Sequence, residues 1–289
     1  MTKILLEVLI TGLLLGGLYA LISVGLSLQY GVARILNISH GEFIMLGAMT
    51  TWTLYTGLGI NPLVSLAICG PLALASGFLI HKTLFRRLLA SSASPAIFES
   101  NSMLAAFGLM FILQNIALII WRADTRAYSY LSIPVHFLGT LFGANRLLTF
   151  GITMVIGLAF YLFLSLTRTG KAIRAAAQDP ATAGLMGVNI NHMLALCFGL
   201  GAAMAAVAGV LISMCYSVNA VMGLEYTVIA IIVVVLGGLG SIPGSFLGGF
   251  ILGLVGSVVT FLEPGLALVA YYVIFIILLL IRPTGLLGR

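Results

Sequence analysis

The most constraining feature of this sequence is a series of long apolar segments, each near the length that crosses a lipid bilayer. A helix rises 1.5 Å per residue, so about 20 apolar residues span the roughly 30 Å hydrocarbon core. The apolar segments therefore predict an all-α polytopic membrane protein with eight to ten transmembrane helices. It forms one domain over residues 1–289. The segments are Leu5–Tyr30, Leu36–Tyr55, Pro62–Leu84, Met103–Trp121, Leu147–Leu166, Met193–Ser217, the glycine-interrupted Tyr226–Phe261, and Leu266–Ile281.

The composition and the placement of charge agree with a membrane protein. Only 7% of the residues are charged, whereas a soluble domain carries about 25%. The basic residues gather at the ends of apolar segments, which the positive-inside rule places in the cytoplasm. We therefore expect a cytoplasmic C-terminus, an outer Arg122–Arg146 loop and an outer N-terminus. Lys3 alone favours the opposite side for the N-terminus. We expect no nucleic-acid partner. The three basic groups are Lys82, Arg86 and Arg87; Arg168, Lys171 and Arg174; and Arg282 and Arg289.

Polar residues interrupt the apolar pattern where the second segment begins. They are Asn37, Ser39, His40 and Glu42, grouped around Gly41. Asn37 or Ser39 can cap the next helix, with Glu42 in its first turn, where the helix dipole favours an anion. Alternatively, His40 and Glu42 lie on a translocation path or at its gate, because ionisable groups at membrane depth are costly and mark functional sites.

The longest polar stretch on the expected cytoplasmic side covers residues 167–188 and predicts two short helices. The first covers Lys171–Ala177, and the second begins with Asp179 as N-cap and Pro180 as first residue, ending near Gly187. Regular capping and many alanines favour an element that docks on a cytoplasmic partner through its small residues over a solvated connector. The candidate docking residues are Arg168, Gly170, Lys171, Arg174, Ala176, Gln178, Asp179 and Gly187.

The sequence gives no indication of catalysis. Gly170-Lys171 is not preceded by a phosphate-loop pattern, and Ala172 stands where a Ser or Thr would contact magnesium. No serine–histidine–aspartate set, H-E-x-x-H motif or paired carboxylate motif is present. We therefore expect a chain that is not an enzyme and holds no cofactor or metal, and any ATP must be hydrolysed by another subunit.

Two further places break the apolar pattern in the C-terminal half. Gly237, Gly238 and Gly240 precede a proline, and such residues disfavour a helix interior. They predict either a tight turn between two spans or a helix break beside a translocation path. Glu225 opens an apolar segment near the expected outer face. It can cap that helix, or receive a substrate ammonium group or a partner from outside.

Four segments together resemble the branched-chain amino-acid ABC importer permease family, specifically the shorter of its two homologous permeases. They are Leu36–Ala48, Gly170–Asp179 continuing to Gly187–Ile190, Val235–Gly249, and Arg282–Gly288. They occur in the family's order and spacing from the second apolar segment to the last residues. The resemblance therefore covers essentially the whole chain.

The resemblance implies a bacterial-type inner-membrane importer with five parts. These are two different permeases, two cytoplasmic ATP-binding subunits and an extracytoplasmic solute-binding protein. It also implies that Gly170–Gly187 is the coupling loop and that transport proceeds by alternating access. Relatives are assigned to branched-chain amino acids, to urea and short amides, and to other small acids; amino acids are the most frequent substrate. Two alternative interpretations remain. A stand-alone carrier or channel would leave the structured cytoplasmic loop unexplained, and a membrane-embedded enzyme would need a catalytic constellation that the sequence does not show.

Overall fold

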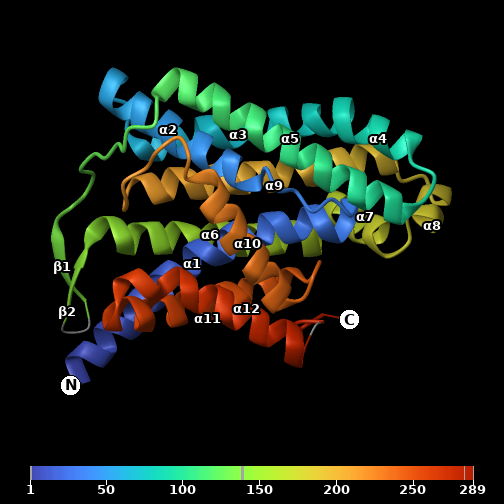
Figure 1. Cartoon of the computed structure of the whole chain (residues 1–289). Coiled ribbons are helices and arrows are strands. Elements are labelled where there is room, and N and C mark those ends of the chain that lie inside the picture. Colours follow the sequence, from blue (N-terminus) through green and yellow to red (C-terminus); the bar gives the residue numbers. More distant parts are fainter. Residues whose placement is uncertain (1, 138–139, 283, 289) are drawn as a thin grey trace.

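The computed structural model describes residues 2–137, 140–282 and 284–288 and shows a bundle of helices with one short β-hairpin (Figure 1). The long elements are α1 (Thr2–Ala33), α2 (His40–Leu58), α3 (Pro62–Ile80), α5 (Pro95–Trp121), α6 (Ala144–Leu166), α9 (Ile190–Ser213), α10 (Gly223–Gly237), α11 (Ile242–Leu262) and α12 (Ala267–Ile281). The short elements are η1 (His81–Phe85), α4 (Arg86–Ser91), β1 (Pro134–Phe137), β2 (Thr140–Gly143), α7 (Arg168–Gln178), α8 (Pro180–Leu185) and η2 (Pro264–Leu266).

Seven helices of the described chain are long and apolar enough to cross a membrane. They are α1, α3 with its continuation through α4, α5, α6, α9, α11, and α12 with η2. The shorter α10 is apolar as well, and α2 has 19 residues. The expected all-α polytopic membrane protein is confirmed for this bundle. The antiparallel β1–β2 hairpin is a short addition within the Arg122–Arg146 loop.

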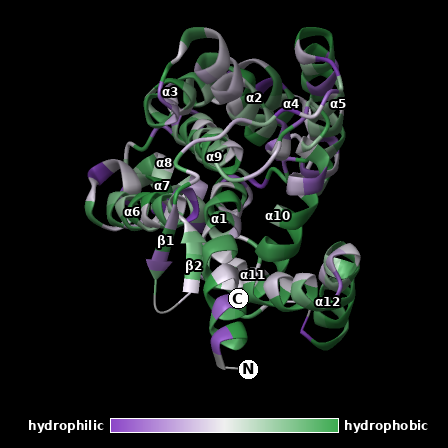
Figure 2. Cartoon of the chain, turned by 90° about the vertical axis from the view of Figure 1, so that its left-hand side faces the viewer, coloured by the Kyte–Doolittle hydropathy of each residue, from purple (hydrophilic) through white to green (hydrophobic). Residues whose placement is uncertain are grey.

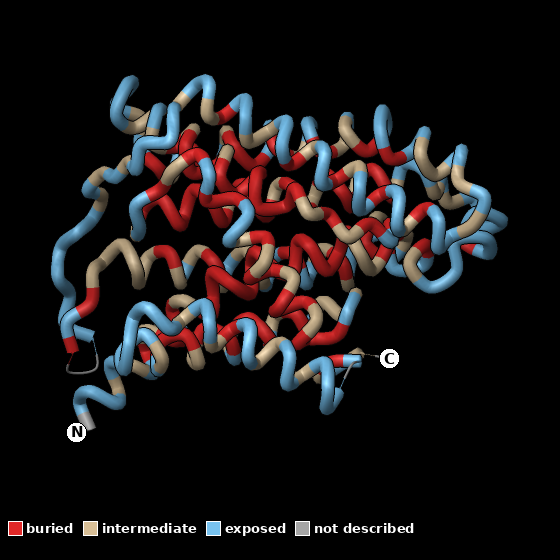
Figure 3. Tube along the Cα trace, in the orientation of Figure 1, coloured by how far each residue is buried: buried red, intermediate tan, exposed pale blue. Residues whose placement is uncertain are grey.

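Helix α1 and helix α9 form the centre of the bundle, where Figure 3 shows most of the buried chain. Helix α1 packs against α11, α9 and α6, and α9 packs against α3 and α2. The α1–α11 contact is close because glycines face it: a Cβ on Gly253 would overlap the backbone of Gly16. Helix α11 therefore packs against α1 through small residues, which allow the two backbones to approach closely.

Proline and capping residues fix where several helices begin. Asn61 accepts a hydrogen bond from Leu63 N at the start of α3, and Ser241 accepts one from Gly244 N at the start of α11. Each is followed within two residues by a proline, a residue favoured in the first helical turn because its missing N–H is not needed there. The breaks between spans therefore follow from local sequence chemistry.

The bundle has two distinct ends (Figure 1). The hairpin end carries β1, β2 and the N-terminus, and the α7–α8 end carries α4, α7 and α8. Hydrophobic residues cover most of the helix bodies, whereas hydrophilic residues stand out at β1 and at the start of α1 (Figure 2). Large apolar side chains are exposed along the outward helix faces, for example Ile119 at 82% and Val155 at 68%. Such a surface is suited to lipid.

Candidate functional site

Two helices begin inside the bundle, and their first turns touch. The Gly41 backbone N–H in α2 donates a hydrogen bond of 2.8 Å to Thr227 Oγ1 in α10. From this junction α2 runs toward the hairpin end, where Tyr55 donates a hydrogen bond to Ser129 O. Helix α10 runs the other way, toward the end of α1, where Gly240 lies against Gly31. The partial positive charges of two helix N-termini therefore meet in the interior.

A polar turn leads the chain into α2. Asn37 Oδ1 accepts hydrogen bonds from Ser39 N (3.1 Å) and Ser39 Oγ (2.6 Å), and Asn37 Nδ2 donates to Gln29 Oε1 (3.2 Å). Gln29 Nε2 in turn donates to Phe198 O. Ser39 occupies the N-cap position, but its side chain makes no capping bond. The capping interpretation is therefore correct for the position of Ser39 and wrong for the role of its hydroxyl, which is held by Asn37.

His40 and Glu42 are fully buried at this junction. His40 Nε2 donates to Ile22 O at 3.0 Å, while His40 Nδ1 and both carboxylate oxygens of Glu42 have no hydrogen-bond partner among the described residues. Gly223 leaves the space that the Glu42 carboxylate occupies, because a Cβ there would overlap it. Burial of an unpartnered polar group is costly. The structure thus brings Asn37, Ser39, His40, Gly41 and Glu42 together with the start of α10.

Glu225 lies in the first turn of α10, and its side chain is exposed. It lines a cavity of about 520 Å³ between the N-terminal half of α1 and the helices α10, α11 and α12. We call this space the outer cavity, because its lining includes Arg146 and the start of α1, which the charge pattern predicts to face outward. Arg146, at the start of α6, also lines it. Sequence analysis singled out Glu225 but missed Arg146, which was noted there only as the end of a loop.

The glycine segment forms a turn between α10 and α11. Gly238 and Gly240 have φ angles of +102° and +79°, a conformation that favours glycine. The C-terminal tail closes over this turn, because Leu286 N donates to Leu236 O and Leu287 N donates to Gly237 O. Two of the four segments that carry the family resemblance therefore contact each other. None of the three glycines lines the outer cavity.

The predicted two-helix loop is present at the α7–α8 end. Asp179 caps α8 by accepting hydrogen bonds from Ala181 N (2.9 Å) and Thr182 N (3.1 Å). The Thr182 hydroxyl also donates to Asp179, and this bond is the main reason that the Asp179 pKa lies below its ordinary value. Pro180 is the first residue of α8, and Gly187 follows it with φ +86°. The predicted start of the second helix, with Asp179 as N-cap and Pro180 as first residue, is confirmed.

The exposed surface of this loop differs from the small-residue surface that was expected to dock on a partner. Ala176 and Gly170 are buried against the rest of the chain, and a Cβ on Gly170 would overlap the backbone of α6. A contact with a partner through these two small residues is therefore excluded in this conformation. Leu185 and Met186 are instead 89% and 82% exposed at the tip of the loop. The sequence indicated this tip, because two adjacent large apolar residues follow a capped helix. The sequence analysis did not include them among its candidates. The exposed candidates of the loop are Arg168, Lys171, Arg174, Gln178, Asp179 and Gly187.

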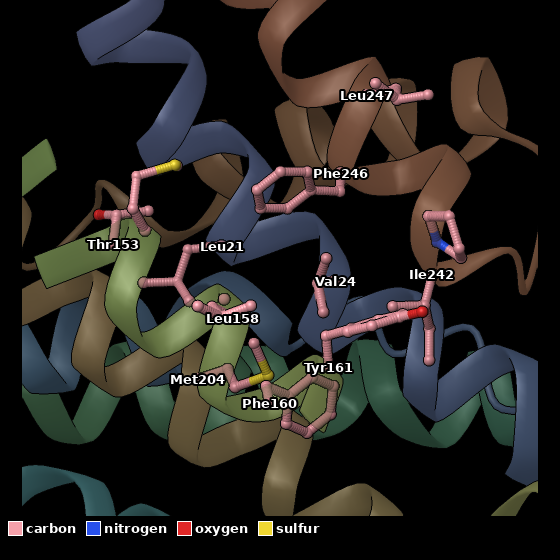
Figure 4. Close-up of a pocket in the computed structure, with 13 residues that line it drawn as sticks. Leu21, Val24, Thr153, Leu158, Phe160, Tyr161, Met204, Ile242, Phe246 and Leu247 are labelled. Carbon is pink, nitrogen blue, oxygen red and sulfur yellow. The ribbon is translucent and has the colours of Figure 1, made fainter. Parts of the chain in front are cut away.

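A second cavity, of about 540 Å³, opens between α1, α6 and the start of α11 (Figure 4). Its lining is apolar apart from the hydroxyls of Thr153 and Tyr161, and Thr153 already donates to Thr149 O. Phe246 and Leu158 point into it. This second cavity therefore offers no charged side chain to a charged solute.

The chain matches the protein family described as "Branched-chain amino acid transport system / permease component" over residues 8–281. The chain belongs to this family. This permease is 34% identical to the high-affinity branched-chain amino acid transport system permease protein BraD of Pseudomonas aeruginosa, over 98% of this chain and 96% of BraD. It is 33% identical to the corresponding permease protein LivH of Escherichia coli K12, again over 98% and 96%.

One solved structure supports the fold. PsaBC from Streptococcus pneumoniae in complex with Fab superposes with a TM-score of 0.52, over 95% of this permease and 91% of that chain, at 13% identity. With the family membership, these findings identify the chain as a permease subunit of an ABC importer and a multi-pass inner-membrane protein. It is not itself an enzyme.

Proposed function

We propose that this chain is one of two related permeases of an ABC importer that carries branched-chain amino acids across the inner membrane. The full-length similarity to BraD and LivH carries this proposal, since both printed names specify branched-chain amino acid transport. Two cytoplasmic ATP-binding subunits bind and hydrolyse ATP, so the chain needs no cofactor of its own. An extracytoplasmic binding protein delivers the solute, and a second homologous permease completes the path.

The α7–α8 end faces the cytoplasm in this proposal. Two expected cytoplasmic basic groups lie in segments at this end, one in η1 and α4 and the other in α7 (Figure 1). Helix α12 also runs toward this end and has Arg282 as its C-cap, which supports a cytoplasmic side for the C-terminal segment. Basic residues at one end agree with the positive-inside rule. The N-terminus and the β1–β2 hairpin then face outward.

The α7–α8 loop couples ATP hydrolysis to transport. Leu185 and Met186 form an exposed apolar tip of the size that an apolar groove on an ATP-binding subunit can accept. Helix α7 contacts α6, α1 and α9, so a displacement of the loop reaches three spanning helices directly. Helix α1 also contacts α10, and α9 also contacts α2. The displacement therefore reaches the junction of α2 and α10, where Glu42 is buried. Alternating access follows when the loop moves these helices around the path.

Purification and uptake test this proposal together. The chain is tagged, extracted gently from its native membrane, and the co-purifying proteins are identified; the complex is then reconstituted with its binding protein in liposomes. We expect an ATP-binding protein and a second permease, with ATP-dependent uptake of leucine in excess of urea. Recovery of the chain alone with ATP-independent uptake contradicts the proposal, and ATP-dependent uptake of urea but not leucine overturns its substrate.

The coupling assignment has its own test. The double variant Leu185→Ser/Met186→Ser removes the apolar tip, and each lost anchor lowers affinity for the ATP-binding subunit about tenfold or more. We expect uptake to fall while the permease still inserts in the membrane. Leu58→Ser is the matched control, because Leu58 is 71% exposed at the opposite end of the bundle. Full uptake by the double variant contradicts the docking role.

A further inference from the structure

The outer cavity extends along α1 from Ile4 to Tyr19. These fifteen residue steps correspond to about 22 Å of helix. At the inner end the Tyr19 and Tyr271 hydroxyls lie 3.3 Å apart, with the two rings edge to face at 6.0 Å between centroids. Gly256 makes room for Tyr271, because a Cβ there would overlap the phenol oxygen. The cavity is therefore a deep recess with a tyrosine pair at its inner end.

Charged groups of both signs line this recess. They are Glu7, Arg146 and Glu225. None of them forms an ion pair within 4 Å with another described residue, whereas Arg126 and Asp124 do so at 3.0 Å in the neighbouring loop. The Arg146 guanidinium instead lies over the Tyr216 ring, 5.8 Å from its centroid. Opposite charges are thus held apart inside one cavity of a membrane protein, where ionisable groups are costly and mark functional sites.

We infer that the outer cavity binds a free amino acid as a zwitterion before it enters the translocation path. Arg146 binds the carboxylate, since a guanidinium offers paired N–H donors that match two carboxylate oxygens. Glu225 binds the ammonium group. Each charge of the solute then neutralises one that the cavity leaves unpaired. A volume of about 520 Å³ lies within the usual range for small-molecule sites.

The rest of the lining selects the side chain. Leu15, Ile229 and Leu268 give the recess aliphatic walls, and these favour a branched aliphatic side chain through burial of apolar surface. Urea has neither a net positive nor a net negative group, so it leaves Arg146 and Glu225 unpaired. This inference rests on the proposed function, because it names the site in this chain that recognises the proposed substrate.

Direct binding tests the inference without the binding protein, which selects solutes before they reach the permease. The purified transporter complex is titrated calorimetrically with leucine, with leucinamide, which lacks the carboxylate, and with 4-methylpentanoate, which lacks the ammonium group. We expect Arg146→Gln to weaken leucine binding about tenfold or more and to leave leucinamide binding unchanged. Glu225→Gln is expected to weaken leucine binding similarly and to leave 4-methylpentanoate binding unchanged.

Matched controls come from the same end of the bundle. Arg122→Gln and Glu263→Gln remove one charge each without touching the cavity lining, so both should bind leucine as the unmodified complex does. Leu268→Trp fills the recess without changing charge and should also abolish leucine binding. If a charge variant fails to fold, leucine binding by Leu268→Trp still tests whether the recess is the binding site.

The outcomes separate this inference from the proposed function. If the unmodified complex does not bind leucine, or if the Arg146, Glu225 and Leu268 variants bind it unchanged, the inference is overturned. ATP-dependent leucine uptake by the unmodified complex, measured alongside, leaves the proposed function intact in either case. If that uptake is absent, the proposed function fails, whatever the titrations show.

Discussion

The Gly41 backbone N–H and the Thr227 hydroxyl are joined by a hydrogen bond of 2.8 Å between the first turns of α2 and α10. The same hydroxyl lies 3.0 Å from Ile38 O, the carbonyl that precedes the start of α2 by two residues. The Thr227 side chain of α10 therefore binds both the segment that precedes α2 and the first turn of α2. The two helices leave this point in opposite directions, an arrangement that aims two positive helix ends at one interior region.

The first prediction concerns that hydroxyl. Thr227→Val keeps the side-chain shape but leaves the Gly41 N–H without its partner, and an unsatisfied buried donor costs about 1–3 kcal/mol. We expect a lower unfolding temperature in detergent and reduced uptake, whereas Thr227→Ser should remain close to the unmodified protein. Thr56→Val is the control, because the Thr56 hydroxyl is exposed and, among the described residues, bonds only to Trp52 O. Unchanged stability of Thr227→Val would show that the junction does not depend on this bond.

The second prediction concerns the closeness of the same two helices. A Cβ on Gly41 would overlap the Gly223 carbonyl, so Gly41→Ala must push α2 and α10 apart. Overpacking of this kind costs about 1–3 kcal/mol. Gly108→Ala in α5 meets nothing within 4 Å, and alanine there favours the helix by up to about 1 kcal/mol. Thermal unfolding of both variants should therefore shift in opposite directions; a Gly41→Ala protein as stable as Gly108→Ala refutes the close contact.

Local patterns in the sequence predicted the features that depend on neighbouring residues. Apolar length predicted the spans, the glycines near Gly238 predicted the end of α10, and Asp179-Pro180 predicted the start of α8. These signals succeed because capping, proline geometry and bilayer thickness act over a few residues. Their success at the fold level does not extend to the depth at which a helix begins.

The depth of His40 and Glu42 could not be predicted in the same way. A 19-residue apolar helix gives the same pattern whether it starts at a membrane surface or inside the bundle, and contact with α10, far along the chain, decides between the two. The burial of Ala176 similarly depends on the packing of α7 against α1 and α9. Arg146 was missed because its neighbours in the outer cavity come from α1, α10 and α12.

The third prediction concerns the turn after α10. Gly238→Ala forces a side chain into a φ of +102°, a strain of about 1–3 kcal/mol, and its Cβ would overlap the backbone of Gly288. The tail should detach, so the Leu286 and Leu287 amides, which now bond to α10, should exchange hydrogen faster. Gly265→Ala has open space and should leave that exchange unchanged. Slow exchange in Gly238→Ala would show that the tail does not depend on this glycine.

The last prediction separates the cap of α8 from its charge. Asp179→Ala removes the acceptor of two backbone N–H groups, so α8 should fray, exchange its amide hydrogens faster and couple ATP hydrolysis poorly to uptake. Asp179→Asn caps a helix about as well as aspartate, so it should retain uptake at neutral pH. Asp179→Lys removes the cap and reverses the charge, and should be the most impaired of the three.

The pH dependence of α8 checks the same assignment. Hydrogen bonds lower the Asp179 pKa, so the folded loop favours the carboxylate over the acid. This stabilisation is complete at neutral pH and is lost as pH falls through the lowered pKa. In the unmodified protein, amide exchange in α8 should therefore accelerate, relative to its intrinsic rate, as pH falls from the ordinary titration range of aspartate through the lowered pKa. Asp179→Asn should lack that transition.

Uptake by the variants distinguishes the cap from the charge. If uptake by Asp179→Asn falls as far as that of Asp179→Lys, the negative charge itself, and not the cap, is what the ATP-binding subunit requires.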